Sequence, residues 1–322
     1  MLSILDPHRA LAIAVLWLPL AAAAFPDRTI EWVVPYPAGG GSDVVARTLA
    51  EPMGKTLGQT IVVNNKPGAA TNIGADYAAK AKADGHVMLT ADTATLAANP
   101  ALYAKLPYNV EKDFAPVGLM ARFPMLLVVN AAVPVKTLAE FTAWARKQPE
   151  GVNYATPGAG SPHHLATELF RERSGLKLTQ VPYRGAAPAV QDVIGGQVPF
   201  MFVDTASGYA HILSGKLRAI GVASPKRVTG FDTVPTLAEQ GMKDFEAYAW
   251  QGLVVPAATP AAAVAILNKA LLAALGTTAV KARFQTLGLE AIPSTPAQMA
   301  AYAKSERDKW GQVIRAGNIH LD

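Results

Sequence analysis

The chain has 322 residues, with 29 Lys and Arg against 24 Asp and Glu, and it contains no cysteine. Hydrophobic residues make up 51% and charged residues 16%, which excludes a disordered chain. The missing cysteine excludes disulfide scaffolds, thiol nucleophiles and cysteine-ligated zinc. The net charge of +5 is mild and no run of five Lys or Arg occurs, so the composition does not favour nucleic-acid binding. This length accommodates one large domain or two of ordinary size.

The N-terminus has the pattern of a secretory signal peptide. His8 and Arg9 precede the apolar run Ala10–Leu20, and four alanines that end at Ala24 follow it. A positive start, a short apolar core and small residues at the end are typical of export signals, although a buried helix is the alternative. The run is shorter than the roughly 20 residues that a membrane span needs. We expect cleavage after Ala24 and a mature protein of residues 25–322 that lies outside the cytoplasm.

Beyond the signal, short apolar stretches alternate with helical patterns. Strands are expected at 31–35, 61–64, 87–90, 126–130, 153–155, 178–181, 200–203, 218–222 and 252–255. A first helix is indicated by the stripe Val45, Leu49, Met53 and Leu57, which Pro52 disturbs. Further helices are expected at 74–83, 138–145, 162–174, 187–195, 261–275 and 296–316. The alternation predicts α/β layers with mostly parallel sheets.

Stretches that resemble catalytic or nucleotide-binding motifs lack required residues. Residues 54–56 resemble the end of a P-loop, but Leu49 stands where the earlier glycine is needed. The glycine turn after the first strand has Val44 where a dinucleotide fingerprint needs Gly or Ala. His163 and His164 are adjacent on a helix, so they point about 100° apart and cannot both face one metal. We therefore expect neither a cofactor nor a metal.

Two glycine-rich turns, each between a strand and a helix, remain as candidate binding elements. The first spans residues 36–43 and the second spans residues 156–164. Ser42 or Asp43 would cap the first helix, and Ser161 the second. Glycine lets the backbone approach a ligand, and a helix start offers free N–H groups that suit a carboxylate. One such turn alone is as often structural, but the pair favours a ligand-binding cleft.

Segments throughout the mature chain resemble one family of exported receptors. They include VPYPAGGGSDVVAR (34–47), VVNNKPGAATNIGAD (62–76), NYATPGAGSPHHLATELF (153–170) and VPYRGAAPAVQDVIGGQVPFMFVD (181–204). The chain thus resembles the Bug (TctC-like) extracytoplasmic solute-binding receptors of tripartite tricarboxylate transporters. The resemblance implies a two-domain α/β periplasmic-binding-protein (flytrap) fold, with mostly parallel sheets and two crossing strands. It also implies a small organic carboxylate ligand and no catalysis.

The resemblance carries ligand-binding residues over by position. In the first turn they are Tyr36, Ala38, Gly39, Gly40, Gly41 and Ser42, and in the second they are Thr156, Gly158, Ala159, Gly160, Ser161 and His164. Arg184 replaces the family's usual Lys, and it either forks onto a carboxylate or lies on the surface. Asp204 matches a family aspartate that either accepts a hydrogen bond from the ligand or braces the cleft.

The clearest departure from the family is Asp92, beside Thr93, in a loop where relatives often have Asn. Its carboxylate would lie beside an anionic ligand. Either Asp92 points away or is neutralised, or the ligand carries an amine or a hydroxyl. We hypothesise that Asp92 shifts the preference away from a plain polycarboxylate.

Chain order in a flytrap predicts the domain boundaries. With crossings near residues 123–129 and 248–254, domain 1 comprises 25–124 with 248–322, and domain 2 comprises 125–247. Trp250 lies on the return crossing, where it either packs or contacts ligand.

The leading functional hypothesis is a monomeric periplasmic receptor that delivers a small carboxylate to a membrane permease. A sensor that presents its liganded form to a signalling partner is the second. The third is an exported hydrolase that uses Ser161 and His164. The signal peptide and the lack of a helix-turn-helix argue against a transcription-factor domain.

Overall fold

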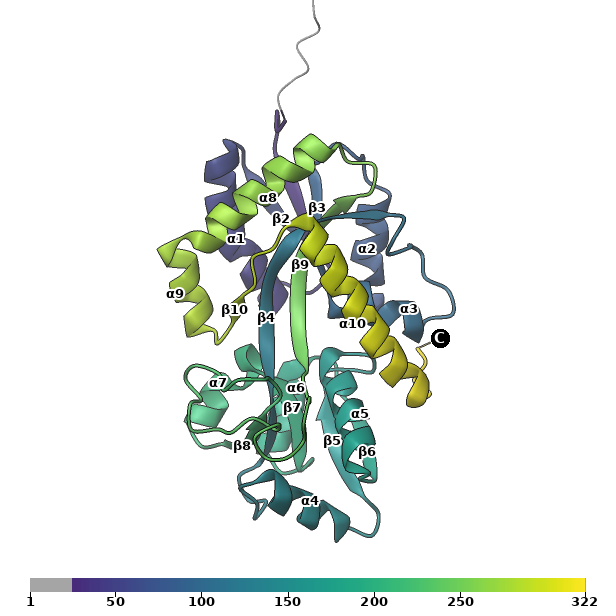
Figure 1. Cartoon of the computed structure of the whole chain (residues 1–322), viewed down its shortest axis with the longest axis vertical. Coiled ribbons are helices and arrows are strands. Elements are labelled where there is room, and N and C mark those ends of the chain that lie inside the picture. Colours follow the sequence, from purple (N-terminus) through teal and green to yellow (C-terminus); the bar gives the residue numbers. More distant parts are fainter. Residues whose placement is uncertain (1–24, 322) are drawn as a thin grey trace, which may run out of the picture.

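The computed structural model describes residues 25–321, so the expected signal peptide and its cleavage site lie outside the described residues. The described chain forms two lobes stacked along the long axis and joined by long strands (Figure 1). The two-domain α/β architecture predicted from the sequence is confirmed.

The elements divide between the two lobes, and β4 (Phe114–Asn130) runs through both (Figure 1). Lobe 1 contains β1 (Ile30–Val34), α1 (Gly41–Leu57), β2 (Ile61–Asn65), the 3₁₀ turn η1 (Ala69–Thr71), α2 (Asn72–Ala79), β3 (Val87–Asp92), the π-helical turn η2 (Thr93–Ala98), α3 (Asn99–Leu102), β9 (Tyr248–Pro256), α8 (Ala261–Gly276), α9 (Thr278–Thr286), β10 (Glu290–Ala291) and α10 (Pro296–Ala316). Lobe 2 contains α4 (Leu138–Arg146), β5 (Val152–Thr156), α5 (Pro162–Ser174), β6 (Leu178–Pro182), α6 (Ala186–Ile194), β7 (Phe200–Asp204), α7 (Thr205–Leu213) and β8 (Leu217–Val222).

Each lobe is built on parallel strands, and the crossing strands run antiparallel to their neighbours. The strand order is β2-β1-β3-β9-β4-β7-β5-β6, and β8 and β10 also pair with β4. In lobe 1, β1 pairs in parallel with β2 and β3, and in lobe 2, β5 pairs in parallel with β6 and β7. Every antiparallel pair among the described strands includes β4 or β9.

Strand β4 changes partners where it passes from one lobe to the other. Its residues from Phe114 to Pro124 pair with β9, whereas those from Met125 onward pair with β7 and β8. Strand β9 begins at Tyr248, directly opposite Pro124. This exchange of partners supports our proposed boundaries, with 25–124 and 248–322 in one domain and 125–247 in the other.

The face of lobe 1 beneath α1 and α8 forms one apolar core. In the stripe expected for α1, Val45, Leu49 and Met53 are fully buried and pack in the same cluster as Leu253 of β9. The fourth residue, Leu57, is half-buried against that cluster. The helix continues through Pro52 without a break. Burial of each such side chain stabilises the fold by about 1.5–3 kcal/mol.

Helix α10 connects the lobes on the opposite face. It packs on β4 and reaches α5 of lobe 2 (Figure 1). Its Trp310 belongs to the same buried cluster as Trp250 of β9 and Phe170 of α5. The carboxylate of Glu306 accepts hydrogen bonds from the indole N–H of Trp250 at 3.0 Å and of Trp310 at 2.9 Å. Trp250 is fully buried in this cluster, which favours packing over ligand contact as its role.

The helix caps expected from the sequence were right for α5 and wrong for α1. Ser161 caps α5, accepting a hydrogen bond from the His164 N–H, and Pro162 occupies the first helical position. Helix α1 instead begins with Gly40 at the N-cap and no capping side chain. The reason is that the carboxylate of Asp43 folds back onto the Gly39 N–H, while Ser42 bonds to β9.

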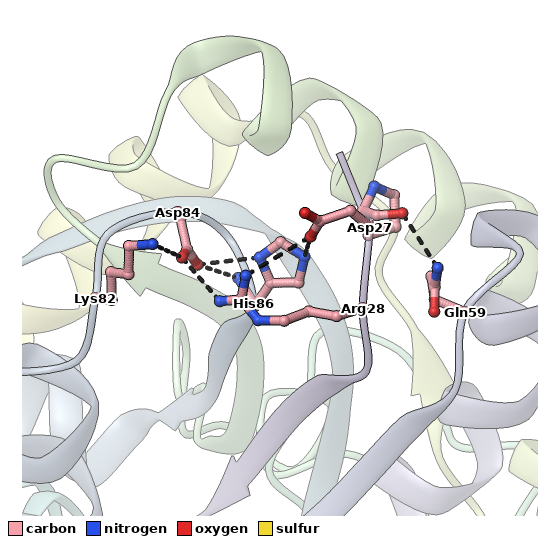
Figure 2. Close-up of polar contacts among 7 residues, drawn as sticks. Asp27, Arg28, Gln59, Lys82, Asp84 and His86 are labelled. Carbon is pink, nitrogen blue, oxygen red and sulfur yellow. Dashed lines mark hydrogen bonds and ion pairs between the residues drawn. The ribbon is translucent and has the colours of Figure 1, made fainter. Parts of the chain in front are cut away.

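The start of the described chain is anchored at the end of lobe 1 that lies far from lobe 2 (Figure 1). Figure 2 shows His86 between two carboxylates, with Nε2 3.0 Å from Asp27 and Nδ1 3.1 Å from Asp84. Arg28 bonds to Asp84 at 2.9 Å, and the Phe25 ring meets His86 edge to face. These contacts fix the entry of the chain into β1.

No single helix among residues 25–321 is long and apolar enough to cross a bilayer. Helices α8 and α9 reach that length and apolarity only as a pair bent by 67°.

Candidate functional site

The expected site residues gather where parallel strands end. Tyr36 follows β1, and Asp92 is the last residue of β3. In lobe 2, Thr156 ends β5 and Asp204 ends β7. In open α/β sheets, ligands bind in the crevice outside the carboxyl ends of the strands. The topology therefore places one wall of a candidate cleft in each lobe.

The first glycine turn is exposed from Pro37 to Gly41 and is held from below by Asp43. The buried carboxylate of Asp43 accepts a hydrogen bond from the Gly39 N–H at 2.8 Å and from Arg47 Nε at 3.0 Å. Asn65 donates to the same carboxylate at 2.9 Å. Burial alone would raise the pKa of Asp43, but these three donors outweigh it and hold the pKa below its usual value. The turn is thus pre-formed around a charged side chain.

Asp92 is buried beneath this turn and both of its oxygens are engaged. One oxygen accepts from the Tyr36 hydroxyl, and the other accepts from the N–H and the hydroxyl of Thr95, each at 2.9 Å. Burial raises the pKa of Asp92 in spite of these donors. Burial and the neighbouring Asp92 also raise the pKa of Tyr36 well above its usual value. The Asp92 carboxylate is thus hydrogen-bonded within the protein, and the alternatives stated for it stay predictions.

The Asp92 network continues into a strained backbone segment. The Thr95 hydroxyl lies 3.0 Å from the Thr71 hydroxyl and accepts from it, because its own proton goes to Asp92. Thr71, Ala70 and Ala69 all have positive φ angles, of 79°, 46° and 45°, which are unfavourable for residues with a Cβ atom. The Asn99 amide stabilises the segment by donating to the Ala70 carbonyl at 2.8 Å.

Thr93 is hydrogen-bonded to the crossing strand β9. Its hydroxyl accepts from the Trp250 N–H at 3.0 Å, and Thr93 is buried. Its role at the site is therefore to join η2 to β9, and a direct ligand contact stays a prediction.

The second turn is also organised by internal hydrogen bonds. The Ser161 hydroxyl donates to the Gly158 carbonyl at 2.7 Å, and Gln180 donates to the Thr156 hydroxyl at 2.8 Å. Gly158 and Gly160 have φ angles of 145° and 73°, which glycine adopts without strain. Ala159 is half-buried between them.

His164 supports this turn from inside. Its Nδ1 accepts from the Gly160 N–H at 3.0 Å, and its ring stacks on Tyr154. Burial, with a smaller contribution from the charge of Arg171, lowers the pKa of His164 to about 4. The ring is therefore neutral at pH 7. The Ser161 hydroxyl is bonded to Gly158 and not to this ring, so the geometry gives the expected hydrolase pair no support.

The neighbouring His163, absent from the expected site residues, is the histidine that meets Asp204. Its Nε2 lies 2.8 Å from Asp204 Oδ2, and both residues are buried. Ser207 donates to Asp204 through its N–H and its hydroxyl. Burial raises the pKa of Asp204, but His163 and Ser207 outweigh it and lower the pKa below its usual value. A bracing role for Asp204 fits these contacts.

Arg184 is exposed beside the second turn. The next residue, Gly185, donates its N–H to the Pro157 carbonyl at 3.0 Å, which fixes this placement. Within residues 25–321, no acidic partner is found for Arg184.

The second turn also touches lobe 1. A Cβ atom placed on Gly160 would lie 2.6 Å from Leu102 Cδ1 and 2.8 Å from Leu321 Cδ1. Leu321 is tied to α3 by its N–H, which donates to the Leu102 carbonyl at 3.0 Å. Gly160 thus lies where the lobes meet.

Among the described residues, no group of three or more His, Asp or Glu side chains could hold a metal ion.

Comparison with known proteins identifies the family. The sequence profile described as "Tripartite tricarboxylate transporter family receptor" (TctC) matches residues 45–319. The chain belongs to this family. It is 36% identical to protein BugT of Bordetella pertussis over 312 residues, which cover 97% of this chain and 96% of BugT.

Solved structures of TctC and Bug proteins share the fold. A Rhodopseudomonas palustris protein, Rpa4515 with adipate, matches with a TM-score of 0.85 and 32% identity, over 92% of this chain and all of that one. MatC of the same organism, with bound malate, matches with a TM-score of 0.81 and 34% identity, over 90% of this chain and all of MatC. The periplasmic binding protein BugD matches with a TM-score of 0.82 and 34% identity, over 92% of this chain and all of BugD.

We predict that Gly160→Ala destabilises the protein more than Gly58→Ala. Both glycines have positive φ, so both substitutions carry a backbone cost of about 1–2 kcal/mol. Nothing lies within 4 Å of a Cβ atom at Gly58, whereas one at Gly160 meets Leu102 and Leu321. Denaturant unfolding measures the difference in the free energy of unfolding. Adding Leu321→Ala to Gly160→Ala should restore part of the stability that Gly160→Ala loses. Equal losses for the two variants would contradict the contact between the lobes.

We predict that His164 makes stability fall on acidification. Its pKa is 6.5 in a model peptide and about 4 when folded, so between these values the unfolded chain binds more protons. Stability is therefore lost as pH drops from about 6.5 to 4, by about 2 kcal/mol at pH 5. Unfolding at pH 7 and pH 5 should show this loss in the wild type and in His320→Asn, where the histidine is exposed. The loss should be smaller by that amount in His164→Asn.

Proposed function

We propose that this protein is a monomeric periplasmic receptor that captures a small organic carboxylate between its lobes and delivers it to the membrane permease of a tripartite transporter. One observation carries the proposal. A pre-formed glycine turn that leads into a helix lies at the strand ends of each lobe, so a ligand between the lobes meets two helix N-termini.

The amides available to a ligand support a carboxylate. The N–H groups of Gly39 and Gly160 already donate to Asp43 and His164, respectively. At the helix starts, the N–H groups of Gly41 in lobe 1 and His163 in lobe 2 have no acceptor among the described residues. Such groups stabilise an anion through hydrogen bonds and the helix dipole.

The charged side chains of the site support a selective receptor. Arg184, at the rim, supplies a guanidinium that can fork onto a second carboxylate or steer the ligand inward. Asp43, Asp92 and Asp204 already hold internal donors and so add negative charge behind the turns. Backbone amides, and not paired cations, then provide most of the attraction.

The relatives support the ligand class and the location. Two structures of the same fold carry adipate and malate, both small carboxylates. The matched family is that of receptors of tripartite tricarboxylate transporters, which supports delivery to a permease. The signal-peptide pattern at residues 1–24 agrees with export.

The test is a thermal-shift screen of the protein from Phe25 onward, refolded to remove any ligand acquired during expression. The screen compares di- and tricarboxylates, hydroxy acids, aromatic acids and amino acids with uncharged amides of the same skeletons. We expect one acid class to stabilise the protein by about 2.7 kcal/mol at a hundredfold excess over its dissociation constant. Stabilisation by the amides but by none of the acids would refute the proposal.

Asp92 gives a second prediction for the same screen. Asp92→Asn removes a buried carboxylate and keeps the Oδ1 acceptor for Thr95, while its Nδ2 can donate to the Tyr36 hydroxyl. We expect plain dicarboxylates to gain about 1 kcal/mol of binding free energy relative to hydroxy or amino acids, because a like charge near the ligand is lost. An unchanged ligand profile would show that Asp92 only braces the turn.

A further inference from the structure

Gln251, on the crossing strand β9, has a buried acceptor with no partner. The residue is 5% exposed, and its Nε2 donates to the Ser42 hydroxyl at 2.7 Å. Its Oε1 is closed off from water and finds no donor among the described residues. Leaving a buried acceptor without a donor is unfavourable, so such an atom marks a place where a donor is missing.

The register places this atom at the first glycine turn. Gln251 pairs directly with Asp92 across β3 and β9. Side chains opposite each other in an antiparallel pair lie on the same face of the sheet. Ser42, which holds the other end of the amide, lies in the first turn of α1. The Gln251 amide therefore lies between the end of β3 and the start of α1, under the residues assigned to the ligand.

Ser42 and Gln251 together form a donor next to an acceptor. The Ser42 oxygen accepts from Gln251, and its own proton has no acceptor among residues 25–321. The Gln251 carbonyl beside it needs a donor. Asp92 does not supply one, because its oxygens are occupied by Tyr36 and Thr95.

This pattern is complementary to an acid that carries a hydroxyl or an ammonium group on the carbon next to its carboxylate. We propose that Gln251 determines specificity, its Oε1 accepting from that hydroxyl or ammonium group while the Ser42 hydroxyl donates to the carboxylate. The inference rests on the proposed carboxylate receptor and narrows its ligand to 2-hydroxy or 2-amino acids.

Discrimination follows from the cost of leaving the acceptor unpaired. When the lobes close on a plain acid, Gln251 Oε1 stays without a donor. A 2-hydroxy or 2-amino acid of the same skeleton satisfies it. Sites built to hydrogen-bond a ligand group reject analogues that lack it far more strongly than apolar pockets reject a missing methylene. We expect a preference of at least tenfold.

The experiment measures affinity by calorimetry within matched sets of acids. The sets are lactate, alanine and propionate; malate, aspartate and succinate; and mandelate, phenylglycine and phenylacetate. In the set that binds, we expect the wild type to favour a 2-hydroxy or 2-amino member over the plain acid by tenfold or more. Gln251→Met, similar in size but without the amide, should reduce that ratio to about one.

Two variants control for structural effects. Gln59→Met removes an amide at the far end of lobe 1, where Gln59 donates to the Pro26 carbonyl, and it should keep the wild-type ratio (Figure 2). Gln251→Glu keeps an acceptor and should keep the preference for the amino acid. Melting of each unliganded variant identifies any that fails to fold, and Gln251→Glu then carries the test.

The outcomes separate this inference from the proposed function. Carboxylate binding without a preference for the 2-substituted acids, or a preference that survives in Gln251→Met, overturns the inference only and points to a buried water at Gln251. The inference is also overturned if the wild type prefers the plain acid and Gln251→Met abolishes that preference. The amide would then present its N–H, and not its oxygen, to the ligand. Failure of all nine acids to bind, when other carboxylates in the screen also fail, overturns the proposed function itself.

Discussion

The two lobes depend on one strand that belongs to both. Strand β4 has 17 residues and exchanges β9 for β7 and β8 between Pro124 and Met125. Because hydrogen bonds hold it on both sides of this point, the carboxyl ends of β3 and β7 are fixed relative to the same backbone. The two glycine turns, at the ends of β1 and β5, take their places from the same arrangement. A change in the register of β4 would move every residue of one wall relative to the other.

Three buried carboxylates organise the walls, and each does so through its own donors. Asp43 holds the first turn, Asp204 meets His163, and Asp92 anchors Tyr36. The pKa values of Asp43 and Asp204 are lowered because their donors outweigh burial, whereas that of Asp92 is raised because burial prevails. Negative charge is thus built into the support of the turns. An arrangement of this kind limits nonspecific attraction of anions and leaves selection to the geometry of amides and neutral side chains.

Elements with strong local patterns were predictable from the sequence. The bounds of α5 and α10 agree with the residues expected, since each begins at a proline that follows a capping Ser or Thr. The first part of β4 was missed, because Pro116, Gly118 and Pro124 argue against a strand. Here Pro116 and Gly118 flank a bulge, and Pro124 lies where the pairing with β9 ends. Helix α7 was also missed, because its nine residues include Ser207 and Gly208, and its start is stabilised by the Asp204 side chain.

The polar contacts of the site were less accessible to sequence reasoning. Nothing in the sequence decides which of the two adjacent histidines faces Asp204, and the resemblance assigned His164 only to the ligand. The strand order decides it, since β7 places Asp204 beside the first turn of α5. Gln251 carried no local signal at all, because its partners Ser42 and Asp92 are distant in the chain and are brought together by the register of β9.

The meeting of Leu321 with Leu102 and Gly160 makes the two ends of the described chain unequal as places to attach a probe. A fluorophore attached at position 321 would lie at the junction of the lobes, where its surroundings change whenever the second turn moves. The same group at the start of the described chain would lie at the opposite end of lobe 1 (Figure 1). An optical reporter of ligand capture therefore belongs at the C-terminal end, and an immobilising tag belongs at the N-terminal one.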